Sequence, residues 1–143
     1  METDHFIFAR LEEFFCETVD PWGAGFKMNM VRDESIEPVP HAYSAAVDEA
    51  TAKQMRPGSD LWTPELHAGR IKYLMTSEKD LETPIEIDSH CDRGHIYAEP
   101  VMIDGWHRYM AHRALRSETI PVSFSGLVSF AEYLRGDTDE RPE

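Results

Sequence analysis

The stretch Val101-Met102-Ile103-Asp104-Gly105-Trp106-His107-Arg108-Tyr109-Met110-Ala111 changes its pattern of apolar residues within a few positions. Its first three residues form a short apolar run of the kind that suits a buried strand. From Tyr109 to Leu115, apolar residues recur at the spacing of one helix face. Gly105 separates the two patterns and can adopt the positive φ of a tight turn. The stretch therefore predicts a strand, a turn and a helix in direct succession.

Two more strands are predicted on either side of this stretch. Apolar residues alternate with other residues over 85–88 and again over 120–124, which is the spacing of a strand with one buried face. A last helix is predicted over 127–134, and Gly136 suits its end. Strands mixed with helices predict an α/β fold, a compact mixed sheet flanked by helices.

Three further helices are predicted from start signals and helical spacing. Thr63 and Pro64 suit the cap and first position of a helix that runs to about Met75. The others are expected from Thr3 or Asp4 through Phe15, with its phenylalanines facing the core, and from Ser44 to Met55. We expect one domain over 1–143, with its core at about 60–136 and a helical and loop extension over 1–59.

Composition narrows the classes of function. The chain has 143 residues, 41% hydrophobic and 29% charged, which is typical of a globular domain. The N-terminus lacks signal-peptide features, no apolar run is long enough to span a bilayer, and Cys16 and Cys91 lie far apart. We therefore expect a cytoplasmic protein with free thiols and without membrane insertion. A net charge of −13 opposes nucleic-acid binding, although Val101–Arg116 forms a local basic island.

The turn at 104–108 has the chemistry of a phosphate site. The first turn of a helix presents backbone N–H groups without acceptors, and the helix dipole adds positive charge there. Gly105 permits close approach of a ligand, Arg108 supplies a forked donor, and His107 supplies a second donor that titrates near neutrality. Asp104 suits a cap better than a Mg²⁺ ligand.

Other residues are weaker candidates. Glu99 could bind a divalent cation or activate water, although an exposed loop glutamate is usually only solvated. Arg70 could reach an anionic ligand, although a surface arginine is more often solvated or ion-paired. His90, Cys91 and His95 suit a metal poorly, because no second pair of ligands follows at a suitable distance.

Three segments resemble the ParB/sulfiredoxin superfamily. They are listed here in chain order: Pro84-Ile85-Glu86-Ile87-Asp88, the turn Asp104-Gly105-Trp106-His107-Arg108 with its flanks, and Thr119-Ile120-Pro121-Val122. They are similar to the first strand, the Asp-Gly-x-His-Arg-x-x-Ala turn and the Ile-Pro-Val strand of that superfamily. The segment 67–75, with its Arg-Ile-x-x-Leu core, also looks like the helix that precedes the first strand.

The resemblance implies that Gly105, His107 and Arg108 contact nucleotide phosphates. Sulfiredoxins have a catalytic cysteine where this chain has Trp106, so the resemblance does not extend to sulfiredoxin activity. The Trp106 side chain could stack on a base, but packing in the core is the favoured role. The expected function is a nucleotide-binding phosphohydrolase, either an ATPase or a nuclease acting on DNA with Mg²⁺ or another divalent cation. Stand-alone members of the superfamily also include plasmid fertility-inhibition proteins.

A second hypothesis is a non-catalytic protein. The acidic charge and the phenylalanine-rich N-terminal segment motivate an inhibitor that docks on a basic protein partner of a conjugation or partition machine. The sequence leaves this alternative open.

Overall fold

A four-stranded mixed sheet forms the centre of the computed structural model, which describes residues 3–40, 62–89, 91–92, 95–96 and 100–142. The strands lie in the order β1-β6-β2-β5, and their bounds are β1 Asp4–Ile7, β2 Ile85–Ser89, β5 Val101–Asp104 and β6 Thr119–Gly126. β6 is antiparallel to β1 and parallel to β2, and β5 is antiparallel to β2. A separate hairpin joins β3 Cys91–Asp92 to β4 His95–Ile96. The α/β fold class predicted from the sequence is confirmed.

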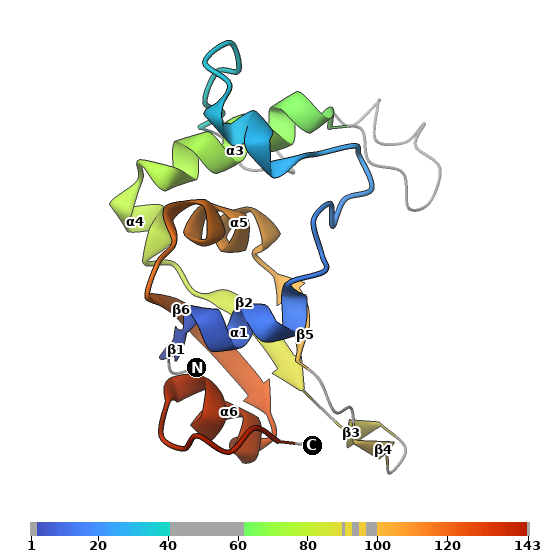
Figure 1. Ribbon diagram of the computed structural model, residues 1–143, viewed down its shortest axis with the longest axis vertical. Coiled ribbons are helices and arrows are strands. Elements are labelled where there is room, and N and C mark those ends of the chain that lie inside the picture. The colour runs from blue at the N-terminus through green and yellow to red at the C-terminus, as the bar shows by residue number, and fades with distance from the viewer. Residues whose placement is uncertain (1–2, 41–61, 90, 93–94, 97–99, 143) are drawn as a thin grey trace.

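The helices flank this sheet in layers. They are α1 Phe8–Phe15, the 3-10 helix η1 Met28–Arg32, α3 Pro64–Met75, α4 Glu78–Leu81, α5 Trp106–Leu115 and α6 Val128–Arg135. Figure 1 shows α3 and α4 stacked on α5, which in turn lies over the sheet, while α6 lies at the opposite end of the molecule. None of the helices in the described ranges has the length and apolar content needed to cross a bilayer.

Local sequence signals set the bounds of three helices. The Thr63 side chain accepts a hydrogen bond from the Leu66 N–H, so α3 begins at Pro64 as predicted. Gly105 and Gly136 are both left-handed, and they fix the start of α5 and the end of α6. The predicted helix over 44–55 lies outside the described residues.

The N-terminal segment is part of the sheet rather than an extension outside the core. Residues 4–7 were expected to begin a helix, but they form β1, whose partners in β6 run from Thr119 to Val122. Phe6 is fully buried there and packs edge-on against Phe124. Burial of an aromatic residue against an existing strand outweighs the local helical spacing. The core therefore begins at Asp4, not near residue 60.

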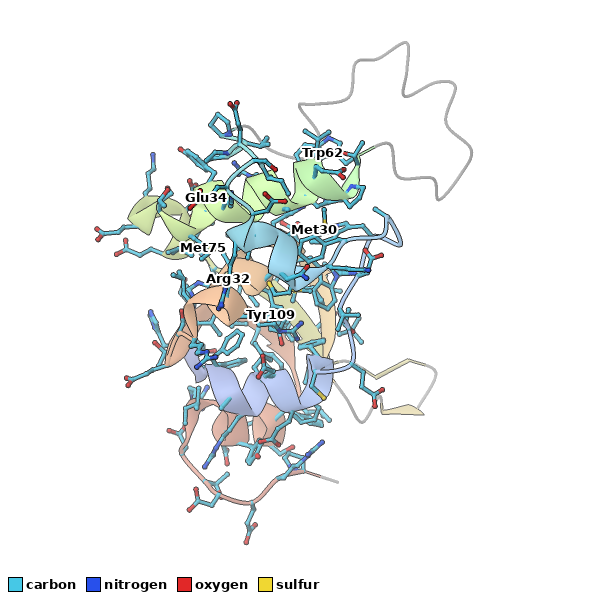
Figure 2. The ribbon with its side chains drawn as sticks, turned by 45° about the horizontal axis from the view of Figure 1, so that its top comes forward. Met30, Arg32, Glu34, Trp62, Met75 and Tyr109 are labelled. Carbon is cyan, nitrogen blue, oxygen red and sulfur yellow. The ribbon has the colours of Figure 1, made fainter. Side chains whose placement is uncertain are left out.

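Aromatic residues from α1 and α5 form the centre of the core. Figure 2 places Tyr109 between these two helices, where it is fully buried and contacts Phe8 and Phe15. On the other side of α1, Phe14 packs against Phe130 of α6. The phenylalanines of α1 thus face the interior, as the helical spacing predicted.

β5 differs from the buried strand that its apolar run predicted. It lies at one edge of the sheet, and its Val101 and Ile103 side chains are 46% and 57% exposed. Met102 alternates with them and packs against the core cluster. At an edge, only one face of a strand is covered by the neighbouring layer, so a continuous apolar run does not indicate burial on both faces.

Candidate functional site

The predicted turn connects β5 to α5, with Gly105 at the helix N-cap. Its φ of +114° is in the left-handed region that favours glycine. A Cβ at this position would lie 2.6 Å from the Ile85 Cγ2 atom, so the turn packs directly on β2. The sequence assigned the glycine to close approach of a ligand. In the structure, close packing on Ile85 is sufficient reason for a glycine here.

Arg108 lies in the first turn of α5 with its side chain only 23% exposed. One of its terminal nitrogens, Nη2, donates to the Pro84 carbonyl oxygen at 3.3 Å and lies 3.7 Å from a carboxylate oxygen of Asp104. Its Nε is buried and has no hydrogen-bond partner among the described residues. Both polar contacts are long for a charged donor, and a buried N–H without an acceptor is destabilising. The guanidinium is therefore fixed in position while part of its hydrogen-bonding capacity is unused.

Arg70 of α3 is close enough to Arg108 for the two charges to oppose each other. Burial lowers the pKa of Arg70, the negative charge of Asp80 raises it, and the positive charge of Arg108 lowers it. The Arg70 guanidinium donates to the Val39 carbonyl oxygen at 3.3 Å and lies over the Tyr73 ring. Two partly buried cations that repel each other make this side of the turn favourable for an anion.

A cluster of two histidines and two tryptophans lies beside the turn. Nδ1 of His67 is 2.8 Å from Nε2 of His107, and Trp22 stacks on both imidazole rings at 4.1 and 4.4 Å. Trp62, at the start of α3 in Figure 2, packs at an angle against the same two rings. Nε2 of His107 is thus engaged by a fully buried His67. Three segments distant in the sequence meet in this cluster.

The sequence interpretation missed His67, Trp22 and Trp62. His67 lies four and seven residues before Ile71 and Leu74, so it occupies the apolar face of the predicted helix. A polar residue on that face was the available signal of a buried partner. Trp22 lies in the Pro- and Gly-containing segment after α1, where no periodicity points to a neighbour.

The other residues predicted for the site differ in burial and in distance from the turn. Trp106 is partly buried and packs edge-on against Phe15 and Tyr109, in agreement with a packing role. Asp104 is exposed and makes the ion pair with Arg108, and Glu99 lies outside the described residues. No group of three or more His, Cys, Asp or Glu side chains within the described part of the chain could hold a metal ion.

The basic island of the sequence does not form one surface. Arg113 points inward and donates to the carbonyl oxygens of Phe15 and Thr18. His112 is buried, with its two ring nitrogens 2.8 and 3.1 Å from the Ser117 hydroxyl and the Leu81 carbonyl oxygen. Arg116 is exposed at the far end of α5. Arg108 is therefore the α5 arginine that stays near the turn.

Comparison with known proteins adds nothing to this geometry. No family model matches the chain, and neither a curated protein nor a solved structure matches it. The functional assignment therefore depends on Arg108, Arg70 and the first turn of α5.

Proposed function

We propose that this protein is a cytoplasmic nucleotide-binding phosphohydrolase whose phosphate site is the turn between β5 and α5. The predicted ligand is ATP or another nucleotide, and a phosphodiester of DNA is the alternative substrate. The ParB/sulfiredoxin resemblance of the turn is part of the proposal. In it, Arg108 and the first N–H groups of α5 hold the phosphoryl oxygens, and water attacks phosphorus in line with the leaving oxygen.

The observation that supports the proposal most strongly is the state of Arg108. Its guanidinium is mostly buried, contacts its two oxygen partners at 3.3 and 3.7 Å, and has a buried Nε without a partner. Phosphate oxygens accept short, charge-assisted hydrogen bonds from such a fork. A bound phosphate would also reduce the repulsion between Arg108 and Arg70.

His107 has a narrower role in this proposal than the turn motif alone suggests. Because its Nε2 contacts His67, the ring is fixed against Trp22. A fixed imidazole in the first turn of α5 can orient the neighbouring backbone N–H groups and Arg108. We therefore propose His107 as a positioning residue for the phosphate site, and we assign phosphate contact to Arg108.

Mg²⁺ or another divalent cation belongs to the proposal as an ion that arrives with the nucleotide. Mg²⁺ commonly keeps water and phosphate ligands and needs only one or two carboxylates. Asp104 is the described carboxylate of the turn, and its side chain is 72% exposed, so it can serve as such a ligand. When bound, the cation would neutralise charge on the phosphate oxygens.

The test is a thermal-shift titration with ATP and Mg²⁺, combined with assays of phosphate release from ATP and nicking of supercoiled plasmid. We expect ATP at about 100 times its Kd to stabilise the wild-type protein by about 2.7 kcal/mol. Arg108→Ala should abolish this stabilisation and the hydrolysis, and Arg70→Ala should weaken both.

Arg116→Ala is the matched control, because it removes an exposed arginine from the other end of the same helix. It should respond to ATP like the wild-type protein. An Arg108→Ala variant that binds and hydrolyses ATP as the wild-type protein does would exclude the turn as the phosphate site.

A further inference from the structure

A cavity of about 460 Å³ lies where α4 and α5 meet the strand pair β1–β6. Cavities that bind small molecules have volumes of about 300–1,000 Å³, so this one is large enough for a ligand. It is lined by His5, Glu78, Leu81, Glu82, His112, Thr119 and Pro121. Neither Arg108 nor another residue of the first turn of α5 lines it. The cavity is therefore separate from the proposed phosphate site.

The more buried walls of the cavity are uncharged. Pro121 is buried, Leu81 is partly buried, and His112 is only 6% exposed. The two ring nitrogens of His112 are engaged by the Leu81 carbonyl oxygen and the Ser117 hydroxyl. Because a carbonyl oxygen only accepts, Nε2 carries the proton and Nδ1 accepts from the hydroxyl. Burial lowers the pKa of His112, so its ring is neutral at pH 7.

Two carboxylates line the exposed part of the same cavity. Glu78 is the first residue of α4 and Glu82 is its C-cap, so the two lie four residues apart. Like charges at this spacing repel each other. Neither carboxylate forms an ion pair within the described ranges, and the lining residues include no lysine or arginine. A positive charge placed between Glu78 and Glu82 would therefore be attracted by both and would reduce their repulsion.

We infer that this cavity binds a small organic cation, a primary ammonium group on a short apolar chain. The apolar chain contacts Leu81, Pro121 and the neutral His112 ring. The ammonium group lies between the carboxylates of Glu78 and Glu82. An anion does not fit, because both carboxylates would repel it. A metal ion does not fit either, since no three His, Cys, Asp or Glu side chains of the described residues are placed to hold one.

The test titrates hexylamine, hexanol and hexanoate at millimolar concentration into the ¹⁵N-labelled full chain at neutral pH. The three probes share one apolar chain and differ in charge. We expect hexylamine to shift the amide signals of Leu81, His112 and Thr119. It should bind about fivefold more tightly than hexanol, because exposed ion pairs contribute modestly, and hexanoate should bind most weakly. Added salt should reduce the difference between hexylamine and hexanol.

Charge-removing variants locate the site. The double variant Glu78→Gln with Glu82→Gln keeps the shape of both side chains and removes both charges. In it, hexylamine and hexanol should bind equally, and the affinity for hexanol should be that of the wild-type protein. Glu132→Gln is the matched control, because it removes the charge of an exposed glutamate on α6. It should leave the preference for hexylamine unchanged. The dispersion of the amide spectrum checks the fold of each variant.

The inference would be wrong if hexylamine left the signals of Leu81, His112 and Thr119 unchanged, or if the wild-type protein bound hexylamine and hexanol equally. A preference for hexylamine that survives in the double variant would also overturn it, because the cation would then bind elsewhere. None of these measurements uses ATP or a variant of Arg108. Failure of the phosphate site would therefore leave the result at this cavity intact.

Discussion

Arg108 and Arg113 lie on the same helix, yet they differ in how many of their guanidinium donors are hydrogen-bonded. Arg113, near the C-terminal end of α5, donates to Glu12, to the Tyr109 hydroxyl and to two backbone carbonyl oxygens at 2.9 to 3.1 Å. It also lies over the Tyr109 ring. Arg108, near the N-terminal end, makes two long contacts and leaves its Nε unpaired.

The comparison shows that Arg113 stabilises the fold, whereas Arg108 keeps hydrogen-bond donors that a ligand can use. Folding has arranged the surroundings of Arg113 so completely that no donor is left for a ligand. At Arg108 the fold accepts an unsaturated, partly buried cation, which costs stability. In this molecule, a partly buried arginine with unpaired donors is therefore a better indicator of function than the presence of an arginine in a motif.

The largest predicted effect is at Arg113. Arg113→Leu leaves the carbonyl oxygens of Phe15 and Thr18 without their donor and leaves Glu12 without its partner. We expect a loss of about 3 kcal/mol in the free energy of unfolding, because several charge-assisted hydrogen bonds disappear together. Urea denaturation measures it, with Arg116→Leu as a control that changes stability by less than about 0.5 kcal/mol. A similar loss in both variants would mean that the Arg113 contacts are weak.

Gly105→Ala should have the second largest effect. The new Cβ would clash with Ile85 and would also require a left-handed φ of +114°, so we expect a loss of about 2 kcal/mol or more in the free energy of unfolding. Gly25→Ala is the control, since Gly25 has a φ of +89° and a Cβ added there would have no atom within 4 Å among the described residues. The difference between the two variants isolates the packing cost, and equal losses would show that backbone strain alone matters.

Arg108→Met should have a smaller effect and differ in sign from Arg113→Leu. It removes an unpaired buried N–H and the charge repulsion with Arg70, while it keeps most of the side-chain volume. We expect stability between unchanged and about 1 kcal/mol higher, together with loss of ATP-dependent stabilisation. Thermal unfolding with and without ATP measures both quantities. A marked loss of stability would mean that Arg108, like Arg113, belongs to the structure.

The smallest predicted effect is a pH dependence at the C-terminal end of α5. Burial lowers the pKa of His112, its hydrogen bond to the Leu81 carbonyl raises it, and the charge of Arg108 lowers it. The unfolded chain therefore binds a proton first as the pH falls below about 6.5, so stability decreases on the acid side and is retained above that pH.

Urea denaturation between pH 7.5 and pH 5.5 should show this decrease in the wild-type protein. The slope should be smaller in His112→Gln and unchanged in His5→Gln, which removes an exposed histidine. Identical slopes in all three proteins would exclude His112 as the source.

Elements with regular spacing could be predicted from the sequence, and their partners could not. The alternation at Ile85 and Ile87 and the Thr63 cap depend on neighbours in the chain, so β2 and α3 were found at their observed positions. β1 lies within the segment predicted to be a helix, because Ile7 and Phe8 fit a helical stripe with the residues that follow. Its strand conformation depends on pairing with β6, from the other end of the chain.

The site shows the same division. The strand, the left-handed glycine and the helix of the turn were predictable, because a change of period marks each boundary. The contact of His107 with His67 and the stacking of Trp22 were not, since they join segments far apart in the sequence; the position of His67 on an apolar helix face indicates burial but not the partner. Likewise, only tertiary packing distinguishes Arg108 from Arg113, whose acceptors lie in and after α1.

The pairing of β1 with β6 has a consequence for synthesis of the protein. β6 lies between β1 and β2, and it is the last strand of the described chain to leave the ribosome. Until it emerges, β1 and β2 have no common neighbour, and Phe6 and Ile85 of the nascent polypeptide lack the strand that separates them in the sheet. Contacts of such long sequence separation form slowly. Completion of the sheet should therefore wait until β6 has left the ribosome.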